Sequence, residues 1–191
     1  MSADCDATTN GDGPQLASAA FAGTSLRGRS WAVLLGVENW IRRSGIVDPE
    51  LNSWLDHLWA WGSVTPETFD SWYAARPALV NASVYKLTPE LHQRCLDQHL
   101  DPDHVLRLVA AAHHVPHGNL FGAIVWSWSD EAIEDAARVL ALYELALPSP
   151  DVLPPSPRDE MHGWGSTVSA DTVDRIRRLE WAAPEIDEDA D

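Results

Sequence analysis

The sequence predicts a mainly α fold, a single-domain helical bundle of about six to seven helices with disordered acidic termini. Three observations lead to this prediction. A helix-start tripeptide recurs along the chain, apolar residues follow it at helical spacing, and the chain is long and apolar enough for one core. It has 191 residues, 45% of them hydrophobic, which suffices to bury a substantial core without a second domain.

The helix-start tripeptide consists of a capping side chain, a proline and an acid. Asp or Thr can accept hydrogen bonds from the free amides of the first turn, Pro fits where no amide bond is lost, and the acid suits the helix dipole. Ser129-Asp130-Glu131 and Ser169-Ala170-Asp171 are versions without proline. The versions with proline are Asp48-Pro49-Glu50, Thr65-Pro66-Glu67, Thr88-Pro89-Glu90 and Asp101-Pro102-Asp103.

Apolar spacing places the first three helices. A stripe of Leu34, Val37 and Ile41 indicates a helix over 29–43, closed by Gly45. A short third helix around Trp72 ends at Pro77. Between them, the helix after Asp48 ends at Gly62, and its apolar face consists of Leu51, Trp54, Leu55, Leu58 and Trp61.

The later helices are placed in the same way. Helices are expected after Thr88 and after Asp101, and Pro116 makes continuation of the second past about His114 costly. The stretch 120–128 is short and apolar, so it fits either a buried strand or a helical turn. A final helix is expected over 170–181. The core-facing stripes are Val105, Leu108, Val109 and Ala112 after Asp101, and Ile133, Ala136, Ala137 and Leu140 after Ser129.

The domain boundaries follow from composition. Residues 1–22 are expected to be a disordered segment, 23–181 one helical domain, and 182–191 an acidic disordered tail. Within the domain, the proline-rich run over 147–160 should extend along the surface.

The charge of the chain excludes some classes of partner. The formal net charge is -16, which repels phosphate backbones, so no nucleic-acid partner is expected. The same charge would attract a basic protein and speed the encounter. The opening residues resemble neither a signal nor a transit peptide, and no apolar run approaches the roughly 18 residues of a membrane span. We therefore expect a cytoplasmic protein with no membrane partner.

Two histidine-containing clusters are candidates for metal or thiol chemistry. His92, Cys95 and His99 share one face of the helix after Thr88, but that helix separates them too widely for all three to bind one ion. His113 and His117 are four residues apart, as in helical zinc sites. Because Pro116 should interrupt their helix, the second cluster, with His114, is interpreted as a helix end and turn.

No recognised catalytic motif occurs. The string Gly163-Trp164-Gly165-Ser166 matches no phosphate loop or dinucleotide fingerprint. The acids from Asp130 to Asp135 are interpreted as residues that suit the helix dipole rather than as an acid/base pair. The sequence therefore does not support an enzyme, and no cofactor is expected.

Ten tryptophans are unusual at this length. Trp54, Trp61 and Trp72 are explained by helix faces. The better candidates for a recognition surface, where aromatic anchors concentrate, are Trp59, Trp126, Trp128 and Trp164.

The string Gly118-Asn119-Leu120-Phe121-Gly122-Ala123, the helix after it, the proline-rich run and then His162-Gly163-Trp164-Gly165 resemble small immunity proteins of bacterial polymorphic-toxin systems. The resemblance implies a non-catalytic protein that neutralises a cognate toxin by covering its active site, commonly with an acidic surface against a basic toxin. It carries over no functional residue.

The leading hypothesis is thus a protein-binding inhibitor, an immunity protein in its specific form, whose partner is a basic protein. One alternative is a metal- or thiol-dependent enzyme that uses Cys95 with His92 or His99, aided by His57. Another is an acidic regulatory or DNA-mimicking protein. The partner-binding residues expected under the leading hypothesis are Trp126, Trp128, Glu131, Glu134, Asp135 and Trp164.

Overall fold

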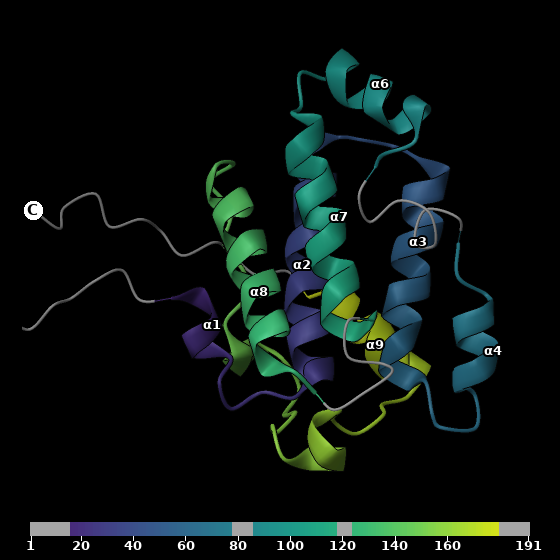
Figure 1. Cartoon of the computed structure of the whole chain (residues 1–191), viewed down its shortest axis with the longest axis vertical. Helices are drawn as coiled ribbons and strands as arrows, with labels where there is room; N and C mark the ends of the chain where they lie inside the picture. Colours follow the sequence, from purple (N-terminus) through teal and green to yellow (C-terminus); the bar gives the residue numbers. More distant parts are fainter. Residues whose placement is uncertain (1–15, 78–85, 118–123, 180–191) are drawn as a thin grey trace, which may run out of the picture.

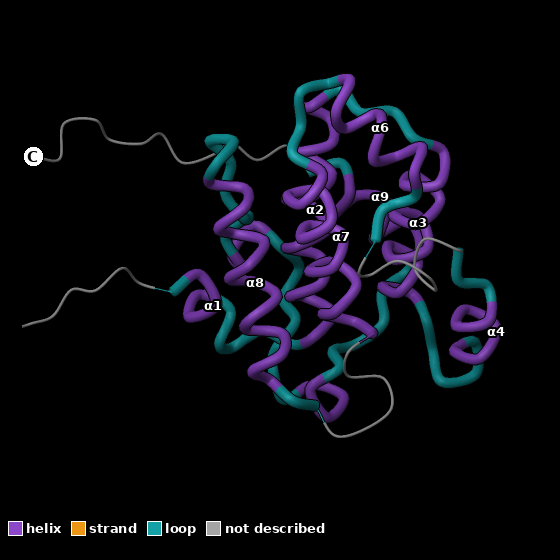
Figure 2. The backbone as a smooth tube through the Cα atoms, turned by 45° about the horizontal axis from the view of Figure 1, so that its top comes forward, coloured by secondary structure: helices purple, strands orange, loops and turns teal. Residues whose placement is uncertain are grey.

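The computed structural model describes residues 16–77, 86–117 and 124–179, and within them the chain is built from helices (Figures 1 and 2). The mainly α fold class is confirmed: these ranges hold no strand, and one β-bridge joins Thr24 to Pro157. The α-helices are α1 (Ala17–Ala20), α2 (Leu26–Ser44), α3 (Pro49–Ala60), α4 (Phe69–Ala74), α6 (Pro89–Asp97), α7 (Pro102–His117), α8 (Trp126–Ala141) and α9 (Ala170–Arg177). Three 3-10 turns accompany them, η1 (Trp61–Ser63), η2 (Pro150–Val152) and η3 (Glu160–Gly163).

Helix α2 is the central element of the bundle. It contacts α7 and α8 on one side and α3 and α9 on the other, while α1 packs against α8 (Figure 1). Nearly every residue of α2 is buried, as expected of a helix surrounded by neighbours. This burial includes the charged residues Arg27, Arg29 and Glu38.

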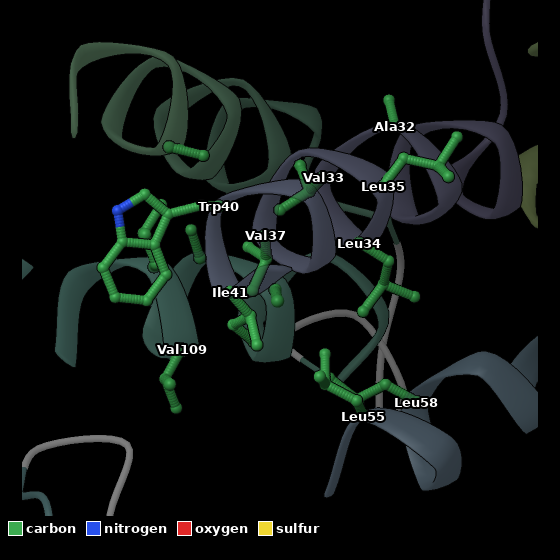
Figure 3. Packing of buried hydrophobic residues seen from close by; sticks show 14 of the residues in the cluster. Ala32, Val33, Leu34, Leu35, Val37, Trp40, Ile41, Leu55, Leu58 and Val109 are labelled. Atoms are coloured by element: carbon green, nitrogen blue, oxygen red, sulfur yellow. The ribbon is translucent and has the colours of Figure 1, made fainter. Parts of the chain in front are cut away.

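The main core fills the space between α2 and its neighbours. In Figure 3, Leu34 lies toward Leu55 and Leu58 of α3, whereas Trp40 lies toward Val109 of α7. A smaller satellite core forms beside it, from η1 to α4. Its buried residues are Trp61, Val64 and Trp72, with Phe69, Tyr73 and Trp164 packed against them.

Three of the expected helix starts are confirmed by their caps. The side chains of Asp48, Thr88 and Ser169 accept hydrogen bonds from backbone amides in the first turns of α3, α6 and α9. The stop at Gly45 is also confirmed, since Gly45 ends α2 in the left-handed region with φ 72°.

Two of the expected starts are wrong. Helix α4 begins at Phe69, because Thr68 Oγ1 accepts from the Thr65 amide and closes a turn there. Helix α8 begins at Trp126 without a side-chain cap. Ser129 lies inside it, where its hydroxyl donates to the Trp126 carbonyl and accepts from the buried Arg29.

The expected end of α7 near His114 is also wrong, since the helix continues to His117 with Pro116 in its last turn. Proline lacks an amide hydrogen, so it forfeits one helical hydrogen bond there, and Pro116 is buried next to the fully buried Val115. The open question at 120–128 is answered only in part: 118–123 lie outside the described residues, and Trp126 onward is helical.

The helical domain begins earlier than the expected boundary at residue 23. Phe21 is in the main core, and the Ser18 amide of α1 donates to Glu134 of α8 at 2.7 Å. The expected disorder of residues 1–15 and of the acidic tail 182–191 lies outside the described residues. The expected extent of the last helix to 181 is wrong, since α9 ends at Arg177 and the Arg178 amide donates to the carbonyls of Arg175 and Ile176.

The proline-rich run passes along the beginning of α2. The Ser25 amide donates to the Ser156 carbonyl, and the Arg158 amide donates to the Gly23 carbonyl. This contact brings η3 and the residues after it against α2 and η1. None of the described helices combines the length and the apolar character that a membrane span needs.

Candidate functional site

The first candidate site is a groove formed by α1, α7 and α8, which lie side by side in Figures 1 and 2. We call it the α8 groove, and its volume is about 920 Å³. It is lined by Leu16, Ser18, Ala110, Ala111, His114, Ser127, Trp128, Asp130, Glu131, Ala132, Glu134, Asp135 and Arg138.

Large apolar side chains at the groove are exposed. Trp128 is 49% exposed and Leu16 is 63% exposed. The small side chains of Ala110, Ala111 and Ala132 line the groove as well and leave it room. The groove can therefore accept an apolar side chain of a partner.

The acids of the groove differ in how far they are neutralised. Asp130 forms an ion pair with the buried Arg29 at 2.5 Å. Asp135 forms ion pairs with Arg107 and Arg138. These two carboxylates hold the fold together and contribute little free charge.

Glu131 and Glu134 differ from these two acids in their ion pairing. In the described part of the chain, no cationic side chain lies within ion-pair distance of either. Glu134 accepts a hydrogen bond from the Ser18 amide. Burial raises the pKa of Glu134, but hydrogen bonds from Ser18 and Ala17 and the charge of Arg138 outweigh burial and lower it. Glu134 is therefore ionised at neutral pH.

The structure brings together four of the six expected partner-binding residues: Trp128, Glu131, Glu134 and Asp135 line the α8 groove. It places the other two elsewhere. Trp126 packs against the guanidinium groups of Arg29 and Arg158, and Trp164 belongs to the satellite core. Trp59, expected as a surface candidate, is in the main core at 2% exposure.

The cluster of His92, Cys95 and His99 does not form a site. Cys95 is fully buried, and burial raises the pKa of its thiol. His99 lies beyond the end of α6 with φ 57°, so it does not share the face of His92 and Cys95. Across the described ranges, no group of three or more His, Cys, Asp or Glu side chains is arranged to hold a metal ion. A thiol enzyme built on Cys95 would thus lack an accessible nucleophile.

The second histidine cluster has a different role from the expected turn. Because α7 continues through Pro116, His113 and His117 stack with ring centroids 4.1 Å apart. Trp72 of α4 stacks on His117 at 5.0 Å and on His57 of α3 at 4.6 Å. We call His57, Trp72, His113 and His117 the histidine stack.

The histidine stack holds neutral imidazoles. Burial, with smaller contributions from neighbouring cations, lowers the pKa of His57 and of His113 to about 4 and that of His117 to about 2. Both ring nitrogens of His117 are buried, and neither has a hydrogen-bond partner among the residues that the structure describes. The rings therefore pack as aromatic side chains. Sequence reasoning missed the stack because His57 is remote from the other two and because Pro116 argued against their alignment.

Comparison of the chain with protein-family models, with curated proteins and with solved structures finds no match to any of them.

Proposed function

We propose that this chain is a non-catalytic protein-binding domain that docks a basic partner in the α8 groove. The observation that carries the proposal is the meeting, in one groove, of exposed apolar side chains with two carboxylates that form no ion pair within the described ranges. Trp128 supplies the apolar anchor, and Glu131 and Glu134 supply the charge.

The apolar part of the groove supports a protein partner. Single exposed apolar residues are common on protein surfaces, but large ones gathered at a concave surface are typical of interfaces. Tryptophan is the residue type most often found at the energetic centre of an interface. An aliphatic or aromatic side chain of the partner could lie on Trp128 and over the alanines of the groove.

The charge supports a basic partner. A Lys or Arg side chain of the partner that reaches Glu131 would form an ion pair that none of the described residues provides. The formal net charge of -16 adds long-range attraction for such a protein. Duplex DNA mimicry, which charge alone would favour, leaves the exposed Trp128 and Leu16 without a role.

The specific form of this proposal is an immunity protein of a bacterial toxin system that acts in the cytoplasm. Its support is the resemblance of the glycine-containing strings described above, together with the acidic groove. Under it, the partner is a cognate toxin whose gene lies beside that of this chain. Co-expression with this chain should relieve the growth defect that the toxin causes.

The groove is tested by affinity capture with matched variants. Wild-type protein, Trp128→Ala and Glu131→Lys are immobilised and exposed to a lysate of the source organism. The control for charge is Asp174→Lys, an exposed acid on α9, and the control for apolar area is Leu142→Ala, which removes a side chain that is 61% exposed. Retained proteins are identified by mass spectrometry.

We expect one basic protein to be retained by the wild type and by both controls and to be lost from both groove variants. Retention of the same proteins by all five baits, or of none by the wild type, contradicts the proposal. Displacement of duplex DNA from the captured protein would instead identify a DNA mimic.

A further inference from the structure

A second cavity lies apart from the α8 groove, between the first turn of α2, η1, α4 and the residues that follow η3. Its volume is about 410 Å³, within the range of small-molecule sites. Its aromatic walls are formed by Trp61, Phe69 and Trp164. The rings of Trp61 and Trp164 meet edge to face, with centroids 5.7 Å apart. We call it the Arg27 pocket, after the one charged side chain among its lining residues that is buried.

Arg27 is a buried cation without an anion. The side chain is 5% exposed, and its guanidinium donates to the carbonyls of Trp61, Val64 and Gly165. It also lies over the Trp61 ring, 4.6 Å from the centroid. In the described part of the chain no carboxylate pairs with it, although buried charges in proteins are normally paired. Burial lowers the pKa of Arg27 to about 10, so it remains protonated at neutral pH.

The pocket has more donors than acceptors. A guanidinium carries five N–H groups, and the three carbonyls leave two of those on Arg27 without an acceptor among the described residues. The indole Nε1 of Trp61 is also a buried donor without an acceptor in the described part of the chain. An acceptor of negative charge is therefore the group that this wall of the pocket lacks.

The segment 161–165, part of the pocket wall, is held in an unfavourable conformation. Met161 and His162 have φ 48° and 57°, in the left-handed region that non-glycine residues rarely adopt, and Gly163 and Gly165 follow with positive φ. Hydrogen bonds to Arg27 tie this segment to α2, since the Arg27 amide donates to Trp164 and its guanidinium to Gly165. Backbone strain of this kind gathers at ligand sites more often than elsewhere.

We propose that the Arg27 pocket binds a small aromatic carboxylate, with the carboxylate on the Arg27 guanidinium and the ring between Trp61, Phe69 and Trp164. The carboxylate supplies the missing anion and accepts from the free N–H groups of Arg27, where charge-assisted hydrogen bonds are strong. The ring replaces water against aromatic walls. This proposal does not depend on the α8 groove.

The test compares 1-naphthylacetate with 1-naphthylacetamide, which has the same shape but no charge. Binding of each to the full chain is measured by isothermal titration calorimetry. We expect the carboxylate to bind with a dissociation constant of about 1 mM or lower and the amide to bind about tenfold more weakly. Equal binding of the two, or no binding of the carboxylate at about 5 mM, overturns the proposal.

Variants locate the binding. Thr167→Trp fills the pocket from an exposed position on its wall, and Asn52→Trp is the matched control at an exposed position on α3. The first should weaken binding of the carboxylate at least about tenfold, because the ring then has no space. The second, and Trp128→Ala in the α8 groove, should leave it unchanged. Binding to Thr167→Trp with wild-type affinity overturns the proposal.

Arg27→Met removes the charge while keeping the length of the side chain. Where circular dichroism shows this variant folded, its preference for the carboxylate over the amide should disappear, and a retained preference overturns the proposal. Where it does not fold, the probe pair and Thr167→Trp decide the matter.

Discussion

The histidine stack is expected to make the folded protein lose stability in mild acid. In the unfolded chain a histidine takes up a proton near pH 6.5. In the folded chain His57 and His113 do so only near pH 4, and His117 near pH 2. Above pH 6.5 both states are neutral and the histidines leave stability unchanged. As the pH falls from 6.5 toward 4, the unfolded chain binds protons that the folded chain does not, so stability is lost.

The size of this effect follows from the pKa values. A pKa of about 4 or lower for one histidine in the folded state removes at most about 2 kcal/mol of unfolding free energy between pH 7 and pH 5. Three such residues act together in the stack, and a domain of this size has about 5 to 15 kcal/mol in total. The protein should therefore be marginally stable near pH 5.

The assay is urea unfolding followed by tryptophan fluorescence at pH 7 and pH 5, with the variant His117→Phe. Phenylalanine keeps an aromatic ring in the stack but cannot take up a proton. The variant should lose about 2 kcal/mol less than the wild type between the two pH values. At pH 7 it should be at least as stable, because the substitution removes the two buried ring nitrogens of His117, which have no partner among the described residues. His92→Phe, at an exposed position, is the control. A wild-type stability that does not change between pH 7 and pH 5, or an unchanged pH dependence in His117→Phe, would refute the reasoning.

Three further predictions concern single positions. Gly45→Ala should lower the unfolding free energy by about 1 kcal/mol in urea titration, because Gly45 has φ 72°, which alanine adopts only with strain. A methyl group there would meet no neighbour, so backbone strain alone is measured. A neutral effect would show that the strain is absent. Asp130→Asn should cost about 2 kcal/mol in the same assay, because it leaves Arg29, 1% exposed, without its anion, and equal stability of variant and wild type would contradict this. Cys95 should react with a thiol-specific chromogenic disulfide only after unfolding, since it is fully buried and burial raises the pKa of its thiol; rapid reaction in the native protein would reopen the thiol-enzyme alternative.

Local chemistry explains which helices could be predicted. Asp48, Thr88 and Ser169 act on amides three residues away, so their sequence context alone determines the cap. Thr65 and Ser129 present the same side-chain chemistry, but Thr68 closes a turn at Thr65, and a tertiary contact decides the role of Ser129. The hydroxyl of Ser129 accepts from Arg29, a residue a hundred positions earlier.

The candidate sites could be predicted only in part for the same reason. Trp128, Glu131, Glu134 and Asp135 lie within one helix, and their spacing shows that they lie near one another. Arg27 gives no such signal: an arginine near a helix start is usually exposed, and its burial depends on carbonyls far along the chain. Trp164 was expected at a protein interface, whereas it forms a wall of the Arg27 pocket.

The binding of a basic protein in the α8 groove is tested most directly by the affinity of the captured partner. Its dissociation constant is measured for the wild type and for Glu131→Lys at about 50 mM and about 300 mM salt. We predict binding by the wild type that weakens with salt, and binding by the variant that is at least about tenfold weaker at low salt. Equal affinity of the two proteins at low salt would show that the partner does not dock in this groove.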